Sequence, residues 1–97
     1  MKTTREYIEL LRSCKADMME RYHITKLGIF GSVARGEQRE NSDIDIVYEG
    51  EPDLFSRIRM KSDLEKRLGC RVDLVRFRKQ IEGTLFAEKL QRDLIYV

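Results

Sequence analysis

The spacing of apolar residues in the first quarter of the chain is typical of an amphipathic helix. Apolar side chains in steps of three and four residues predict a helix over 4–22. Thr3 and Glu6 fit a capping box at its start, with Thr3 as the N-cap. The residues expected on the buried side of this helix are Tyr7, Leu11, Cys14, Met18 and Tyr22.

Two short apolar runs after this helix predict β-strands. Residues 27–30 form a brief run that ends at Gly31, and residues 44–48 are rich in β-branched side chains. Between the two runs, 32–35 is predicted to be one helical turn and 36–41 a polar loop. A strand, a turn, a loop and a second strand are therefore expected in this order.

The segment 50–69 has the features of a second long helix. Pro52 and Asp53 are typical of a helix entry, and Gly69 is typical of a C-cap. Met60 does not fit the predicted apolar stripe, so a kink near residue 62 is the alternative to a straight helix. The stripe expected to face the core consists of Leu54, Ile58, Leu64 and Leu68.

The last quarter of the chain continues the alternation. A third strand is predicted at 72–75 and a helix at 79–90, whereas 94–97 fits either an extension of that helix or a short strand. Alternating helices and strands predict an α/β (α+β) fold, with a small mixed sheet of about three strands and helices packed on it in αβαβαβα order. The length of 97 residues predicts a single domain over 1–97.

Composition excludes several classes of protein. Apolar residues make up 41% of the chain and charged residues 37%, which indicates an ordered chain with one modest core. No apolar run approaches the roughly 20 residues of a membrane span, and 1–6 lacks the pattern of a secretion signal, so we expect a cytoplasmic protein and no membrane contact. Cys14, Cys70 and His23 do not have zinc-ligand spacing, and we expect two reduced, mostly buried thiols.

Charge is distributed unevenly along the chain. Segment 37–53 holds seven acids and one base, a local charge of −6, and 57–79 holds nine bases and three acids, a local charge of +6. The acidic segment is compatible with binding of a cation, and the basic segment with docking of an acidic partner or with holding a triphosphate. Two solvated faces of opposite charge are the simpler alternative. Nucleic-acid binding is disfavoured, because the net charge is only +2 and no aromatic residues are interleaved with the basic ones.

Three aspartates are the candidate metal ligands. Asp43 and Asp45 lie two apart at a strand, so they share one face while the intervening isoleucine points to the other. Asp73 lies in the next predicted strand, and it completes a three-carboxylate cluster if the two strands are neighbours. Carboxylate oxygens suit Mg²⁺ or Mn²⁺, and neutralisation by nearby arginines is the structural alternative.

The turn at 31–35 is a candidate phosphate site. Gly31 allows the backbone to approach a ligand closely, and Ser32 provides a hydroxyl at the start of a helical turn. Arg35 is suited to a forked contact with a phosphate, the alternative being an ordinary turn with Arg35 in solvent. A P-loop is excluded, because Glu37 stands where that motif requires lysine.

The order and spacing of these features resemble the signature of a known superfamily. An apolar strand, Gly-Ser, ten intervening residues and Asp-Ile-Asp are similar to the motif of the nucleotidyltransferases typified by DNA polymerase beta. The longer string Gly-Ser-Val-Ala-Arg-Gly-Glu followed by Ser-Asp-Ile-Asp resembles its minimal nucleotidyltransferase branch. Residues 72–75 and the closing Ile-Tyr-Val continue the resemblance, which implies the nucleotidyltransferase fold.

The resemblance implies an activity, a cofactor and site residues. It implies transfer of a nucleoside monophosphate from a nucleoside triphosphate to a hydroxyl, with release of pyrophosphate and with two Mg²⁺ ions (or Mn²⁺) as cofactors. The implied catalytic and metal-binding residues are Asp43, Asp45 and Asp73. The implied nucleotide-binding residues are Gly31, Ser32, Arg35 and Ser42.

The resemblance also implies a partner. Minimal members of the superfamily commonly pair with a small helical HEPN-domain protein as a toxin–antitoxin couple, and transfer AMP from ATP to a tyrosine of the toxin. The alternative is a binding module that neutralises its partner by contact alone. The intact aspartates favour the enzyme, because contact alone has no need of a carboxylate cluster.

Overall fold

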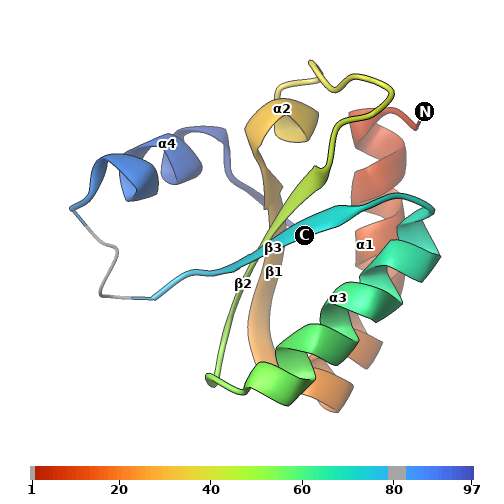
Figure 1. The fold of residues 1–97 in the computed structure, drawn as a ribbon, viewed down its shortest axis with the longest axis vertical. Coiled ribbons are helices and arrows are strands. Elements are labelled where there is room, and N and C mark those ends of the chain that lie inside the picture. The colour runs from red at the N-terminus through yellow and green to blue at the C-terminus, as the bar shows by residue number, and fades with distance from the viewer. Residues whose placement is uncertain (1, 79–82) are drawn as a thin grey trace.

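The structure is a computed structural model that describes residues 2–78 and 83–97. A four-stranded sheet separates two layers: α1 and α3 cover one face, and α4 lies against the other (Figure 1). The elements in chain order are α1 (Thr4–Tyr22), β1 (Ile24–Phe30), α2 (Gly31–Ala34), β2 (Ile44–Gly50), α3 (Leu54–Leu68), β3 (Val72–Arg76), α4 (Leu85–Asp93) and β4 (Ile95–Tyr96).

The sheet is mixed, as predicted, but it has four strands where about three were expected. The strand order is β3-β2-β1-β4, with β1 antiparallel to both of its neighbours and β2 parallel to β3. A parallel pair needs a long crossover, and α3 provides it between β2 and β3. This arrangement makes β3 an edge strand and aligns the starts of β2 and β3.

The first helix has the predicted bounds and the predicted cap. Both hydrogen bonds of the capping box are present between Thr3 and Glu6. Tyr22 is only partly buried, and its hydroxyl donates to Asp63 Oδ2 at 3.0 Å. The remaining four residues of the predicted stripe are buried in the main core: Tyr7, Leu11, Cys14 and Met18.

The predicted stripe of the second long helix is half wrong. Leu64 and Leu68 are buried, but Leu54 and Ile58 are 67% and 58% exposed, and Met60 is buried in their place. The buried stripe of α3 runs in steps of four from Met60, whereas Leu54 and Ile58 lie roughly 80–120° around the helix from the centre of that stripe, at about 100° per residue. The helix is continuous over Leu54–Leu68, so residue 62 does not end it, and the alternative of a kink there stays a prediction.

The C-terminal part also differs from its prediction. Residues 79–82 of the helix predicted at 79–90 lie outside the described residues, and α4 begins at Leu85 after Thr84, whose hydroxyl accepts a hydrogen bond from the Ala87 amide. The ambiguous tail forms β4, which pairs with β1 at Gly28. A side chain at Gly28 would meet the Ile95 carbonyl oxygen at 2.7 Å, so this glycine permits the fourth strand.

Strand β1 begins at Ile24, three residues earlier than predicted. A second, smaller cluster of apolar side chains lies between the sheet and α4, built on Phe30, Val47 and Leu90. Both cysteines are free; Cys14 is buried and Cys70 is partly buried. In the part of the chain that the structure describes, no helix has the length and apolar character to cross a membrane.

Candidate active site

The strand register brings two of the predicted aspartates together. Asp45 on β2 is the direct Cα partner of Asp73 on β3, and on its other side it pairs with Phe30 of β1. Ile44 and Ile46 are fully buried in the main core, so the alternation predicted for this strand is correct. Asp45 is half-buried and Asp73 is exposed at the edge of the sheet.

The third aspartate lies just before β2 and has an arginine partner. Asp43 Oδ1 is 3.3 Å from Nε of Arg71, and both side chains are well exposed to solvent. The amide of Ile44 donates to the Arg71 carbonyl at 2.9 Å, which fixes the two segments side by side. Arg71 is thus the arginine that neutralises part of the cluster, and the sequence alone does not reveal this pair because it depends on the register of β2 and β3.

The electrostatics of Asp45 show that the three carboxylates act on one another. Burial, together with the charges of Asp73 and Asp43, raises the pKa of Asp45 to about 6, while Arg35 opposes the shift. A carboxylate with a raised pKa beside two others is destabilised in its charged form. A bound cation would relieve that destabilisation.

The donor chemistry therefore fits a hard divalent cation, although the ligands are not gathered. Within residues 2–78 and 83–97, no three histidine, cysteine, aspartate or glutamate side chains are placed to hold a metal ion together. Asp45 and Asp73 are adjacent, whereas Asp43 is turned toward Arg71. Metal binding by all three would require Asp43 to leave Arg71, an exposed ion pair that costs little to break.

Asp45→Asn is expected to stabilise the metal-free protein at neutral pH. The folded chain holds the Asp45 proton more tightly than the unfolded chain, so its loss between about pH 4 and pH 6 disfavours the folded state. At pH 4 and below, the variant and the parent should be equally stable. Because the side chain is only half-buried, we expect about 1 kcal/mol at pH 7.5, or roughly 4–8 °C in Tm, rather than the unscreened value of roughly 3 kcal/mol.

Thermal melts in EDTA at pH 4 and pH 7.5 measure this difference. Asp17→Asn, which removes the partly exposed ion pairs of Asp17 with Arg21 and Arg67, is the control and should not show the same gain. A parent protein that is as stable as Asp45→Asn at pH 7.5 would contradict the electrostatic account.

Gly31 lies directly over the Asp45 carboxylate. Its φ is +70°, and a Cβ atom at this position would collide with Asp45 Oδ2. Only glycine combines this backbone conformation with such a close approach. The structure thus gives Gly31 a more specific role than the sequence did, because it joins the turn to the carboxylate cluster.

The turn that follows Gly31 is held in place from the N-terminal helix. Ser32 is partly buried in α2, and no side chain caps the start of this short helix. Thr4 Oγ1 donates to the carbonyl of Val33 at 2.6 Å, which ties α2 to the first turn of α1. Nothing in the sequence pattern pointed to Thr4, since its partner is 29 residues away.

Arg35 is bound to carboxylates in this structure. Its Nη1 is 2.5 Å from Asp93 Oδ2 at the end of α4, and its Nε is 3.0 Å from Glu37 Oε2. The guanidinium therefore links the turn to α4. A phosphate contact by Arg35 would have to replace one of these pairs or use the remaining N–H groups, and Asp93 is a neighbour that the sequence did not reveal.

Ser42 forms part of a tight turn in the loop before β2. Its hydroxyl accepts from the Arg39 amide at 3.1 Å, and its own amide donates to the Arg39 carbonyl at 2.9 Å. These bonds shape the approach to Asp43. The contact between Ser42 and a nucleotide stays a prediction.

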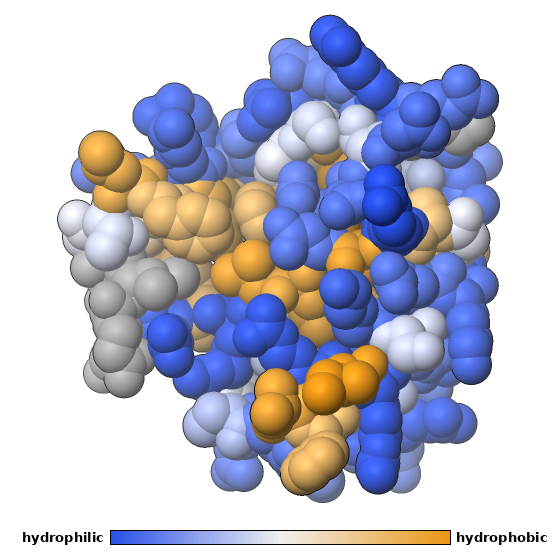
Figure 2. All heavy atoms as spheres, in the orientation of Figure 1, coloured by the Kyte–Doolittle hydropathy of each residue, from blue (hydrophilic) through white to orange (hydrophobic). Residues whose placement is uncertain are grey.

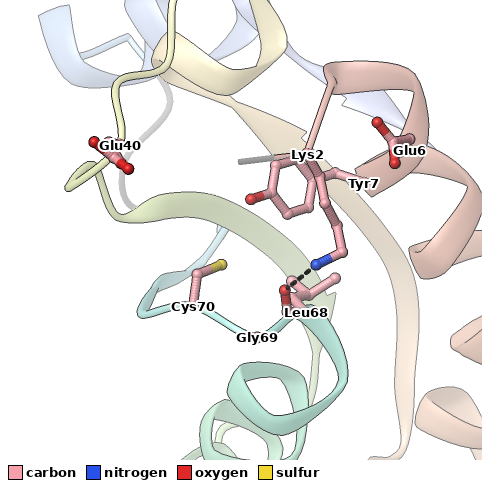
Figure 3. Close-up of a pocket in the computed structure, with 7 residues that line it drawn as sticks. All are labelled: Lys2, Glu6, Tyr7, Glu40, Leu68, Gly69 and Cys70. Atoms are coloured by element: carbon pink, nitrogen blue, oxygen red, sulfur yellow. Dashed lines mark hydrogen bonds between the residues drawn. The ribbon is translucent and has the colours of Figure 1, made fainter.

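A cavity of about 420 Å³ lies beside this loop but does not include the aspartates (Figure 3). Lys2 Nζ donates to the Leu68 carbonyl at 3.2 Å there, at the end of α3. Burial raises the pKa of Tyr7, whose ring enters the cavity. The cavity is lined by Lys2, Glu6, Tyr7, Glu40, Leu68, Gly69 and Cys70, so it is separate from the candidate site, which lies on open surface.

The chain belongs to the nucleotidyltransferase family, because the model of the nucleotidyltransferase domain matches residues 11–97. This confirms the family resemblance of the motif, and nucleotidyl transfer is the enzymatic activity of that family. The fold agrees with a solved candidate minimal nucleotidyltransferase that is 31% identical, with a TM-score of 0.75 and coverage of 97% of this chain and 95% of that one.

Relatives along the whole chain have names with a more specific activity. The chain is 40% identical over its full length, and over the full length of the relative, to a candidate protein adenylyltransferase of Methanocaldococcus jannaschii. It is 37% identical to the protein adenylyltransferase MntA of Thermococcus cleftensis, across 100% of this chain and 98% of the relative. A solved toxin–antitoxin structure with AMP-PNP is 27% identical, with a TM-score of 0.68 over 98% of this chain and 72% of that one.

Proposed function

We propose that this chain transfers AMP from ATP to a tyrosine hydroxyl of a HEPN-domain partner protein, with release of pyrophosphate. The observation that carries the proposal is the direct pairing of Asp45 with Asp73 beneath Gly31. The arrangement supports the proposal, because the turn that we expect to bind phosphate lies beside the carboxylates that we expect to bind the cation. The names of the full-length relatives, which are protein adenylyltransferases, support the choice of AMP and of a protein acceptor.

The residues divide into a phosphate side and a metal side. Gly31 and Ser32 hold the β and γ phosphates through the open backbone of the turn. The carboxylates that hold Mg²⁺ are Asp43, Asp45 and Asp73, and the ion neutralises charge on the phosphates when it is bound. Burial and the repulsion from Asp73 and Asp43 raise the pKa of Asp45, and a bound cation would relieve both effects.

The acceptor hydroxyl approaches from the exposed side of Asp73. Its oxygen forms a bond to the α-phosphorus, the bond from that phosphorus to the bridging oxygen breaks, and pyrophosphate leaves. Asp73 is the exposed member of the pair, so it is placed to orient the hydroxyl and to receive its proton. The open site suits an acceptor that a second protein presents.

Incubation with ATP labelled on the α-phosphate tests this function. With Mg²⁺ and a HEPN-domain protein encoded beside this chain, we expect label to become covalently attached to a tyrosine of that protein. EDTA should abolish the labelling, and CTP, GTP and UTP should label less. Tight binding of the partner without any labelling would support the alternative, a binding module that acts by contact.

A further inference from the structure

The first turns of α3 present apolar side chains to solvent. Leu54, Phe55 and Ile58 are 67%, 72% and 58% exposed, although the same helix buries Met60 and the residues after it. Figure 2 shows them as an apolar patch at the lower end of the molecule, where α3 begins in Figure 1. Neighbouring exposed apolar side chains of this size mark interaction surfaces in soluble proteins.

Three arginines lie beside this patch in one pocket. Arg57, Arg76 and Arg78 line a pocket of about 250 Å³ together with Leu54. Arg57 Nη2 donates to the Leu74 carbonyl at 2.8 Å, and Arg76 Nη1 donates to the Gly50 carbonyl at 3.2 Å. Each guanidinium has five N–H donors, so most of them remain available.

These three arginines also lack acidic partners. Within the described residues, no aspartate or glutamate lies at ion-pairing distance from any of them, whereas Arg35, Arg67 and others are paired. Asp53 lines the same pocket, but its carboxylate accepts hydrogen bonds from the Phe55 amide and the Ser56 amide and hydroxyl as the N-cap of α3. The pocket therefore holds three arginines and one carboxylate, that of Asp53, so it carries a net positive charge.

The position of the arginines argues against a role in holding the triphosphate. Arg76 lies three residues after Asp73 on β3, which is about 10 Å along the strand and on the opposite face of the sheet. The second role considered for the basic segment, docking of an acidic partner, remains. Because β3 is an edge strand, a partner that covers this edge reaches both faces.

We propose that Leu54, Phe55 and Ile58, with the arginine pocket, dock an acidic amphipathic helix of the acceptor protein. The apolar side of such a helix would cover the α3 patch, and its carboxylates would pair with the arginines. A symmetric contact between two copies of this chain is disfavoured, because it would place arginines against arginines. An interface of ordinary size buries about 800 Å² on each partner.

This inference rests on the proposed function for the identity of the partner, and binding measurements test it separately from catalysis. The probe is the purified HEPN-domain protein encoded beside this chain, titrated by calorimetry. Phe55→Ser with Ile58→Ser, and Arg78→Glu alone, should each weaken binding at least tenfold. The matched controls are Leu85→Ser on α4, where the leucine is 77% exposed, and Arg12→Glu on α1. Each control should bind the partner with a dissociation constant within twofold of the parental value.

The outcomes separate the two proposals. The docking surface is overturned if the Phe55→Ser/Ile58→Ser variant and the Arg78→Glu variant both bind the partner as tightly as the parent does. It is also overturned if the parent does not bind the partner. Loss of binding in these variants, with unchanged affinity for ATP and Mg²⁺, supports it even if the parent transfers no label, in which case only the proposed function fails. Light scattering measures the mass of the purified chain in the absence of the partner. If the variants have a lower mass than the parent, the surface binds a second copy of this chain and the proposal is wrong.

Discussion

Asp45→Asn is expected to reduce AMP transfer on the order of 1,000-fold. The carboxylate is the central member of the cluster: it pairs with Asp73, interacts with the charge of Asp43 and lies under Gly31. Asparagine has a similar size but provides a neutral and weaker oxygen ligand, so loss of the ion should cost several kcal/mol of transition-state stabilisation. Initial rates with α-labelled ATP and the partner protein measure the effect.

Two controls distinguish a loss of catalysis in Asp45→Asn from a loss of partner binding or a general effect of removing a carboxylate. The variant should still bind the partner protein with parental affinity, because Asp45 is half-buried and points to the face of the sheet opposite α3. Asp17→Asn on α1 should transfer AMP at the parental rate. Normal transfer by Asp45→Asn would exclude the metal-dependent mechanism, even though the family assignment would stand.

The second large effect is expected for Gly31→Ala, with a loss of transfer of about 100-fold or more. A methyl group at this position would collide with the Asp45 carboxylate, so either the turn or the carboxylate must move. Displacements of about 1 Å in a catalytic constellation cost on the order of 100-fold in rate. The positive φ also disfavours alanine by roughly 1–2 kcal/mol.

Gly36→Ala is a matched control for the backbone strain. Gly36 has a φ of +73°, close to that of Gly31, but a Cβ atom there would meet only Thr4 Oγ1, at 3.7 Å. Both variants should therefore lose similar stability in denaturant titrations, whereas only Gly31→Ala should lose most of its activity. Equal activity losses in the two variants would show that strain alone is responsible.

The parts of the fold that the sequence predicted correctly depend on short-range patterns. Helix α1 has a complete capping box and a regular stripe, and the alternation around Asp45 follows from the geometry of any strand with one buried face. The family motif then implied that Asp73 belongs to the same site as Asp43 and Asp45, but the direct pairing of Asp45 with Asp73 comes from the structure. Local spacing could not supply it, because the register of a parallel pair is set by the crossover helix.

The predictions were wrong or incomplete where contacts between distant elements determine which side chains are buried and which charged groups pair. Leu54 and Ile58 are four residues apart, as core residues of a helix often are, but the structure buries a stripe that begins at Met60 on another side of α3. The partners of Arg35 and Asp43 come from other elements, Asp93 of α4 and Arg71 before β3. Charged pairs of this kind have no period in the sequence, so no pattern reveals them.

The crossover between β2 and β3 has a consequence for the lifetime of the chain. Asp45 and Asp73 meet only after α3 has packed and β3 has docked, so a ligand that bridges them binds the folded chain and not the unfolded one. At 100 times its dissociation constant, such a ligand adds about 2.7 kcal/mol to the stability of a small protein, which typically totals about 5–15 kcal/mol. The nucleotide would then be a folding ligand as well as a substrate, and resistance of the chain to proteolysis would rise and fall with the supply of ATP.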